Sequence, residues 1–286
     1  MPTMPTMPTI TLTAAPSLPP LLARGALLSP LKRPGPGAEA PATRLVLPAA
    51  RADRTRLAAY REVCGFAPDS AALPVTYPHV LGFPLAMRIM AERRFPLPLL
   101  GLVHTSITVT QGHDLPVDEA YELSVHVKEL APHRRGTQAT VVTELRAGDT
   151  RAWTSTSTYL ARHRTDAPAG AAAEERPEPL PAVAEWKLPG DLGRRYGAAS
   201  GDRNPIHLHP LTARLFGFPR AIAHGMWTVA RCLAAHGAEG EVQVRAAFKA
   251  PVLLPTTVTY ASRGPAFELR SARTHLTGEV LRARGG

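Results

Sequence analysis

Residues 196–227 read YGAASGDRNPIHLHPLTARLFGFPRAIAHGMW and place a carboxylate, an amide and an imidazole within six positions: Asp202, Asn204 and His207. Pro205 fixes its own φ angle and biases the preceding residue away from helical geometry, so the chain bends between the carboxylate and the imidazole. Such a bend turns the two side chains toward each other. The stretch is therefore predicted to hold an acid/base pair around one small reactant, such as a water.

Helices are expected on both sides of this bend. Asp191 can cap a short helix that Gly201 ends, because glycine accepts the left-handed conformation common at helix C-termini. A second short helix is predicted over residues 210–216. Residues 223–236 are mostly small or apolar, which indicates a buried helix. Its first turn contains Gly225, whose free N–H and lack of a side chain suit close approach by a ligand oxygen at the positive end of the helix dipole.

The segments SGDRNPIHLHP and FGFPRAIAHGM resemble the signature of the MaoC-like dehydratases, the (R)-specific enoyl-CoA hydratases. The resemblance implies an α+β hot-dog fold, in which an antiparallel sheet wraps around a long central helix. It also implies that Asp202 and His207 are the catalytic pair, that Asn204 is the asparagine of the motif, and that the Gly225 amide polarises the thioester carbonyl. The implied reaction adds or removes water across the α,β double bond of an acyl thioester.

Three further residues, Ser200, His224 and Met226, are expected to position the substrate or the loop around it. His224 is expected to hold the start of the buried helix. Ser200 is interpreted as a packing or capping residue rather than a nucleophile, because no base is set beside it in the sequence. His209 departs from the resemblance, since the family often has aspartate there. The departure affects local hydrogen bonding and leaves the catalytic pair in place.

A metal site is the alternative interpretation of the same histidines. Asp202 together with His207, His209 and His224 offers ligand types that zinc accepts. Neither a His-x-x-x-His spacing on a helix nor a cysteine pair supports it, so no metal is predicted. The implied reaction also needs no nicotinamide or flavin. Coenzyme A or an acyl carrier protein enters only as part of the thioester substrate.

The composition is that of a globular protein with a net charge of +10. No basic run with interleaved aromatic residues points to nucleic acid, whereas a positive field suits the phosphates of a coenzyme A or acyl-carrier arm. No apolar run is long enough to span a membrane. Cys64 and Cys232 lie in apolar helical patterns and are expected to be buried free thiols, which fits a reducing cytoplasm. A homodimer is a further expectation.

Four segments are predicted along the chain. Residues 1–43, which begin with repeats of Met-Pro-Thr, are predicted to be a disordered proline-rich extension. Residues 44–164 and 183–286 each combine helices with alternating β segments. Residues 165–182 have the composition of a linker. The second of the two folded units carries the Asp-Asn-His motif.

The two folded units align as an internal repeat. With Tyr60 under Tyr196, Gly65 falls under Gly201. The positions of the acid, the amide and the base are then occupied by residues without that chemistry, namely Phe66, Pro68 and Ala71. Together with the resemblance, this repeat implies a double hot-dog, with two antiparallel sheets each wrapped around its own helix. The first half would bind the acyl chain and the second half would carry the chemistry.

Two other functions share parts of this pattern. A hot-dog thioesterase would have the same fold and ligand but would cut the thioester bond, and its carboxylate usually works without the Asn-Pro-x-His turn. A non-catalytic acyl-binding module would fit the first half, where Gly82 and Ala86 are expected to line the acyl tunnel. The intact pair of Asp202 and His207 favours the hydratase over both.

Overall fold

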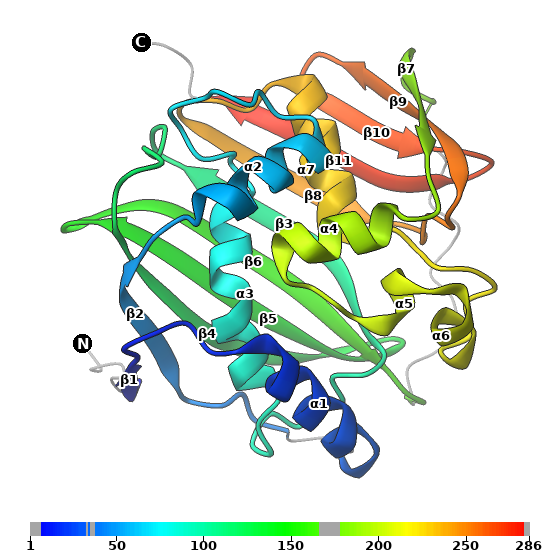
Figure 1. Ribbon diagram of the computed structural model, residues 1–286. Helices are drawn as coiled ribbons and strands as arrows, with labels where there is room; N and C mark the ends of the chain where they lie inside the picture. The colour runs from blue at the N-terminus through cyan, green and yellow to red at the C-terminus, as the bar shows by residue number, and fades with distance from the viewer. Residues whose placement is uncertain (1–6, 33, 35–37, 166–177, 283–286) are drawn as a thin grey trace.

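The computed structural model describes residues 7–32, 34, 38–165 and 178–282. Most of the predicted linker at 165–182 lies outside the described residues, as does the start of the Met-Pro-Thr repeat. In the described part, helices lie on one side of a single large sheet (Figure 1). The mixture of helices with a mainly antiparallel sheet is the α+β class that the sequence predicts.

Eleven strands of the described chain form one sheet, in the order β1-β2-β4-β5-β6-β3-β8-β11-β10-β9-β7. Neighbouring strands are antiparallel, except that β1 runs parallel to β2. The strand bounds are β1 Thr9–Thr11, β2 Arg44–Ala50, β3 Leu102–Gln111, β4 Tyr121–His133, β5 Gly136–Ala147, β6 Thr150–Arg162, β7 Ala182–Leu188, β8 Val242–Phe248, β9 Thr256–Arg263, β10 Ala266–Arg270 and β11 Thr274–Arg282.

The two halves of the repeat meet at the centre of this sheet. β3 of the first half pairs with β8 of the second, from Ser106 opposite Ala247 to Gln111 opposite Val242. The two antiparallel sheets that the sequence predicts are therefore continuous, because this pairing joins them edge to edge. The physical reason is that each separate sheet would leave a row of unpaired N–H and C=O groups at its edge.

Two helices lie over the two halves of the sheet as their central helices (Figure 1): α3, Tyr77–Met90, and α7, Gly225–His236. Between them α2, Arg54–Cys64, contacts α4, Leu192–Ser200. Apolar residues of all four helices and of the inner face of the sheet enter one continuous core. The predicted Asp-Asn-His motif follows α4, and it therefore lies where the two halves meet.

The internal repeat is visible in the ends of α2 and α4. Gly65 ends α2 with a φ of 78° and Gly201 ends α4 with a φ of 84°, so both glycines take the left-handed conformation. Tyr60 and Tyr196, one turn earlier on each helix, lie with ring centroids 5.8 Å apart. The alignment read from the sequence thus pairs residues that occupy equivalent places in the two halves.

Arg61 holds the loop after α2 in the first half. Its guanidinium donates to the carbonyl oxygens of Pro68 at 2.7 Å, Ser70 at 2.6 Å and Ala72 at 2.9 Å. In the aligned second half the equivalent position is Gly197, which has no side chain to hold the loop. The first half therefore uses this place for a structural cation, whereas the second half brings its loop close to the helix.

Residues 7–32 of the N-terminal segment form regular structure, which corrects the prediction of a disordered extension for that part of residues 1–43. β1 pairs with β2, and α1, Leu18–Leu28, contacts α3 before a 3₁₀ turn, η1, at Ser29–Leu31. Leu12 is buried, and Gly25 packs directly on Leu99. Prolines do not prevent this helix, because they occupy its first turn, where a missing N–H breaks no intrahelical bond.

Gly82 and Ala86, which are expected from the sequence to line an acyl tunnel, lie on the face of α3 that packs against the sheet. A β-carbon at position 82 would lie 2.6 Å from Thr143 Cγ2 on β5. Ala86 is buried and, being four residues further along α3, lies on the same face of the helix. These small residues let α3 approach the sheet closely.

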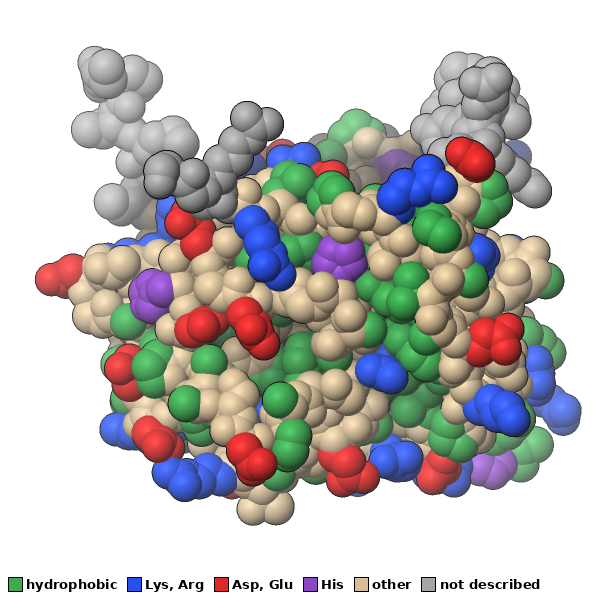
Figure 2. Space-filling model, turned by 90° about the horizontal axis from the view of Figure 1, so that it is seen from above, with side chains coloured by type: hydrophobic (Ala, Val, Ile, Leu, Met, Phe, Trp, Pro, Cys, Tyr) green, Lys and Arg blue, Asp and Glu red, His purple; other side chains and the backbone are tan. Residues whose placement is uncertain are grey.

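On the face seen in Figure 2, Lys and Arg side chains are interspersed with Asp and Glu side chains. Among the residues described, no helix has both the length and the apolar character needed to cross a membrane. Cys64 and Cys232 are buried free thiols, as the sequence predicts.

Candidate active site

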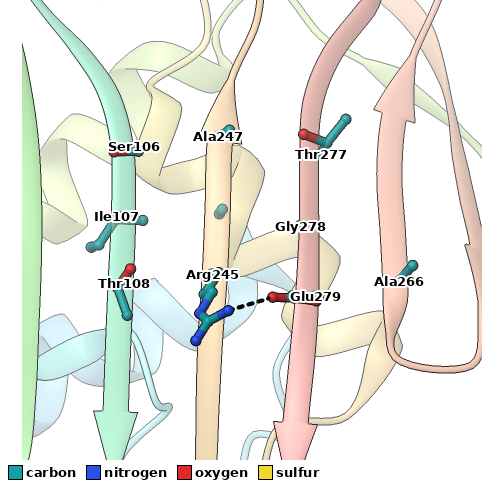
Figure 3. A pocket seen from close by; sticks show the side chains of 10 residues that line it. Ser106, Ile107, Thr108, Arg245, Ala247, Ala266, Thr277, Gly278 and Glu279 are labelled. Carbon is teal, nitrogen blue, oxygen red and sulfur yellow. Dashed lines mark hydrogen bonds and ion pairs between the residues drawn. The ribbon is translucent and has the colours of Figure 1, made fainter. Parts of the chain in front are cut away.

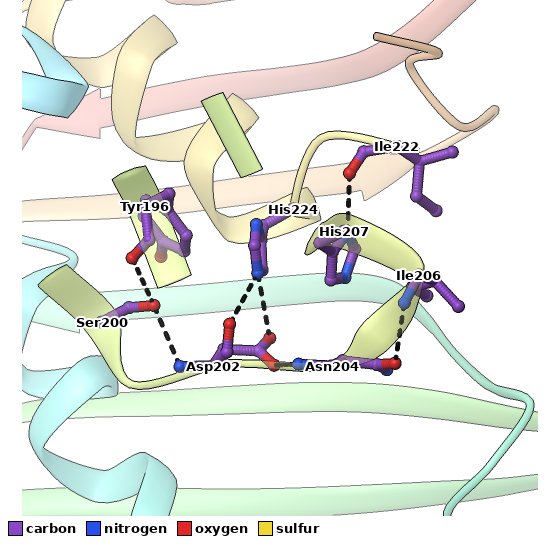
Figure 4. Close-up of polar contacts among 8 residues, drawn as sticks. All are labelled: Tyr196, Ser200, Asp202, Asn204, Ile206, His207, Ile222 and His224. Atoms are coloured by element: carbon purple, nitrogen blue, oxygen red, sulfur yellow. Dashed lines mark hydrogen bonds and ion pairs between the residues drawn. The ribbon is translucent and has the colours of Figure 1, made fainter. Parts of the chain in front are cut away.

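The loop after α4 is fixed by Ser200, which has the structural role expected of it. The Ser200 hydroxyl donates to the carbonyl oxygen of Tyr196 at 2.9 Å and accepts from the Asp202 N–H at 3.2 Å (Figure 4). Gly201 turns the chain between them. These contacts place the Asp202 carboxylate just beyond the helix end, with 28% of its side chain exposed.

Asn204 builds the bend that the sequence predicts. Its backbone N–H donates to Asp202 Oδ1 at 3.2 Å, and its side-chain oxygen accepts from the Ile206 N–H at 3.4 Å. It therefore caps the short helix α5, Pro205–Leu208. The amide positions the aspartate on one side and the helix that carries His207 on the other.

His207 is buried in α5 and held in one tautomer. Its Nδ1 lies 2.8 Å from the carbonyl oxygen of Ile222 (Figure 4). A carbonyl oxygen only accepts, so Nδ1 carries the proton and Nε2 keeps a free lone pair. The imidazole is thereby prepared to accept a proton from a bound water.

His224 stacks on His207, with ring centroids 3.7 Å apart and an angle of 25° between the rings. Its Nε2 donates to the main-chain carbonyl oxygen of Asp202 at 2.9 Å and lies 3.9 Å from the carboxylate Oδ2. His224 also occupies the position before α7. It thus ties the start of the buried helix to the loop that carries Asp202.

Gly225 is the first residue of α7, where helix geometry gives the backbone N–H no partner within the helix. A β-carbon here would lie 3.0 Å from Phe248 Cε1, so the glycine allows a close approach that a larger residue would obstruct. Met226 is buried behind it and packs in the core. The N–H and the positive end of the helix dipole are suited to a developing negative charge.

Burial moves the pKa values of the pair toward each other. It raises the pKa of Asp202, while the positive charge of His207 and the Asn204 N–H oppose the rise. It lowers the pKa of His207, against the opposing effects of Asp202 and the Ile222 carbonyl. It also lowers the pKa of His224 well below its ordinary value, and His207 adds to that shift. The two shifts make a protonated Asp202 and a neutral His207 easier to reach than they are in water.

Two glycines that the sequence analysis did not single out let α4 approach the catalytic loop. A β-carbon at Gly193 would overlap the carbonyl oxygen of His207 and lie 2.9 Å from its carbonyl carbon. A β-carbon at Gly197 would lie 2.8 Å from the Asp202 carbonyl oxygen. The signal for this packing was present as the Gly-x-x-x-Gly spacing, which puts both glycines on one face of the helix.

Only some of the candidate metal ligands lie close together. Metal-ligating atoms of Asp202, His207 and His224 lie within 4.8 Å of one another. However, the Nε2 of His224 that faces this group donates to a carbonyl oxygen and has no lone pair to offer. His209 does not join the group, because its Nδ1 accepts from the Leu211 N–H at 3.1 Å and caps α6, Pro210–Leu215. His209 thus caps a helix at the position where the family often has aspartate.

A shallow hollow of about 400 Å³ lies on the helix-free face of the sheet, across β3, β8 and β11 (Figure 3). Its rim includes Arg245, whose guanidinium donates to Glu279 at 3.3 Å. None of the predicted catalytic residues lines it. The chemistry predicted from sequence therefore belongs to the other face, where α4, α5 and α7 converge.

Comparison with known proteins confirms the family resemblance. A family model described as "MaoC like domain" matches residues 176–263. 3-Hydroxyacyl-thioester dehydratase X of Mycobacterium tuberculosis is 37% identical over 221 residues, which are 74% of this chain and 77% of that protein. A crystal structure of HtdX from the same organism superposes with a TM-score of 0.74 at 32% identity and covers 84% of this chain and 100% of that chain.

More distant structures share the fold. A MaoC-like dehydratase from Phytophthora capsici has a TM-score of 0.67 at 17% identity, covering 84% of this chain and 95% of that chain. The chain belongs to the MaoC-like dehydratases and has their hot-dog fold.

Proposed function

We propose that the protein is a 3-hydroxyacyl-thioester dehydratase, which in the reverse direction acts as an (R)-specific enoyl-CoA hydratase. The observation that carries this proposal is the position of the Asp202 carboxylate and a His207 ring nitrogen, within 4.8 Å of each other beside the first turn of α7. One water can bridge such a gap, since each hydrogen bond spans about 2.8 Å. The family and the mycobacterial relative support the same reaction class.

In the hydration direction, His207 Nε2 takes a proton from the bridging water while the water oxygen attacks C3 of the enoyl thioester. Asp202, in its protonated form, delivers a proton to C2. Both roles suit the pKa directions, because a raised carboxyl pKa favours a proton donor and a neutral imidazole is a base. Dehydration follows the same steps in reverse.

The Gly225 N–H donates to the thioester oxygen, which gains negative charge as the water adds. A single preorganised donor of this kind contributes about 3 kcal/mol to the stability of the transition state. The dipole of α7 acts in the same direction. The substrate is thereby held with its carbonyl at the start of α7 and its double bond at the Asp202–His207 pair.

The test is hydration of crotonyl-CoA, followed by loss of absorbance of the enoyl thioester. Asp202→Asn and His207→Ala should each lower kcat by ~10²–10⁴ in a folded protein. Asp191→Asn is the matched control, because Asp191 precedes α4 without a side-chain capping bond. Near-normal hydration by either active-site variant would refute the assignment. Release of free thiol without hydration would identify a thioesterase instead.

We also propose that the reaction needs no metal, nicotinamide or flavin, so that a chelator leaves kcat unchanged. Coenzyme A or an acyl carrier protein supplies the thioester, and a comparison of the two forms of one acyl chain identifies the carrier. A cytoplasmic location and a homodimer remain part of the proposal. The two buried free thiols support the former, and size-exclusion chromatography with light scattering tests the latter.

A further inference from the structure

A cluster of uncharged polar side chains lies on the inner side of the first half, between its central helix and the sheet. We call it the inner polar cluster and define it as His79 of α3, His104 of β3, and Ser155, Ser157 and Tyr159 of β6. The mechanism uses none of these groups. Polar side chains are unusual in a region that is expected to receive an alkyl chain. Leucine and phenylalanine side chains could line such a region without leaving polar atoms unpaired.

Several polar atoms of this cluster have no hydrogen-bond partner within the described structure. They include His79 Nδ1, His104 Nε2 and Ser155 Oγ, each shielded from solvent. His79 is 9% exposed and Ser155 is 1% exposed. A buried polar atom without a partner costs about 1–3 kcal/mol, so a bound group that pairs with these atoms would be stabilised by them.

The cluster is continuous with the catalytic site through stacked rings. The rings of His79 and His104 are nearly parallel, with centroids 6.1 Å apart. His104 stacks on Tyr159 at 4.5 Å and meets Phe248 at 4.7 Å. Phe248 in turn is the side chain that covers the Gly225 position. A chain whose carbonyl is held at Gly225 therefore passes these rings as it extends into the first half.

Tyr159 provides a second connection. Burial raises the pKa of its hydroxyl, Ser157 opposes the rise, and the Asp202 carboxylate adds to it, which places the tyrosine within electrostatic reach of the catalytic acid. Tyr159, His104 and Phe248 are partly buried side chains. The inner polar cluster thus adjoins the place where the acyl chain leaves the reacting carbons.

The type of ligand follows from the charge of the cluster. Burial lowers the pKa of His79 to about 4 and that of His104 to about 3, so both rings are neutral near pH 7. Neutral imidazoles and hydroxyls both donate and accept hydrogen bonds, but they supply no positive charge for a carboxylate or phosphate. A neutral oxygen function, a hydroxyl or a keto group, meets these requirements.

From this geometry we infer that the enzyme prefers acyl thioesters that carry a hydroxyl or keto oxygen on the chain beyond the reacting carbons, and that the inner polar cluster binds this oxygen. The inference deepens the proposed function, on which it rests, by naming a substrate class. A plain alkyl chain would leave the histidine nitrogens unpaired, whereas an oxygenated chain would pair them.

The experiment compares substrates of one length. Hydration of 2-decenoyl-CoA is measured beside 5-, 7- and 9-hydroxy-2-decenoyl-CoA and the corresponding keto compounds. At least one oxygenated substrate should exceed the plain chain in kcat/KM by about tenfold, the value of one added hydrogen bond in a buried site. The position and type of the preferred oxygen identify where the cluster holds it. Equal or better hydration of the plain chain across the whole series would overturn the inference.

Variants then assign the preference to the cluster. His79→Leu and His104→Phe should each abolish the advantage of the oxygenated chain while leaving crotonyl-CoA, whose chain is short, within about twofold of the wild type. His126→Leu is the matched control, because His126 alternates with the core residues Val125 and Val127 and so lies on the outer face of β4. A loss of preference in the control alone, or in none of the variants, would contradict the assignment.

A binding measurement separates this inference from the proposed function. Calorimetric titration of the wild type with decanoyl-CoA and with saturated hydroxydecanoyl-CoA requires no turnover. Tighter binding of the hydroxylated chain with no hydration of any enoyl-CoA would retain the inference and refute the proposed function. Hydration of crotonyl-CoA and 2-decenoyl-CoA, with no preference for oxygenated chains in either assay, would retain the proposed function and refute the inference.

Discussion

Substitution of Gly193 by alanine tests whether close packing of α4 positions His207, the proposed catalytic base. The new methyl group would overlap the His207 carbonyl oxygen and approach its carbonyl carbon to 2.9 Å. Both are backbone atoms, so no side-chain rotation relieves the contact. Since non-bonded heavy atoms pack best at about 3.5 Å or more, α5 must move away from α4 by about 1 Å.

The expected loss is large for a single added methyl group. A displacement of about 1 Å of a catalytic group costs about 10²-fold in rate, so kcat for crotonyl-CoA hydration should fall by about that factor. Overpacking should also lower the free energy of unfolding by about 1–3 kcal/mol. Stopped-flow or steady-state hydration gives the first quantity and chemical denaturation gives the second.

Gly190→Ala is the matched control, because a β-carbon there would meet only Pro255 Cδ at an ordinary 3.8 Å. It should hydrate crotonyl-CoA at nearly the wild-type rate. A Gly193→Ala enzyme with unchanged kcat and unchanged stability would show that α5 is positioned by something other than this contact.

The other predictions concern stability, oxyanion binding and pH. Deletion of residues 1–32 should lower the melting temperature, since burial of Leu12 alone contributes about 2 kcal/mol, and an unchanged melting curve would restore the view of a disordered extension. Gly225→Ala should lower kcat/KM for crotonyl-CoA about tenfold in a protein that still folds, because its methyl group would press on Phe248. The pKa of Asp202 is raised in the folded state, so ionisation of its carboxyl group lowers the free energy of unfolding as pH rises above 3.8. Asp202→Asn should therefore have a higher melting temperature than the wild type at pH 7. The difference should become smaller toward acid pH. The pKa of His79 is lowered from 6.5 to about 4, so the wild type should lose stability as pH falls through this window, less steeply in His79→Leu.

The sequence by itself determined the local features of this protein. Gly201 ends its helix in the left-handed conformation and Asn204 caps the next turn, because these outcomes depend on the conformational limits of a few adjacent residues. Asp202 and His207 came together as predicted, since only a short bend around Pro205 separates them. The presence of β segments in both folded units also followed from alternation along the chain.

Tertiary structure decided whatever depends on residues far apart in the chain. β3 and β8 pair as edge strands of the two halves, and no local sequence pattern predicts which two edge strands pair. The helix at Leu18–Leu28 has a proline-rich sequence with weak signals, and its packing on α3 supplies the contacts that order it. The bond from His224 to the Asp202 carbonyl and the stacking of His79 on His104 both join different elements of the fold. Sequence periodicity indicates which face of a helix or strand is apolar. Only tertiary packing decides which other element contacts that face. The hydrogen-bond partners and the pKa of each buried polar group depend on that contact.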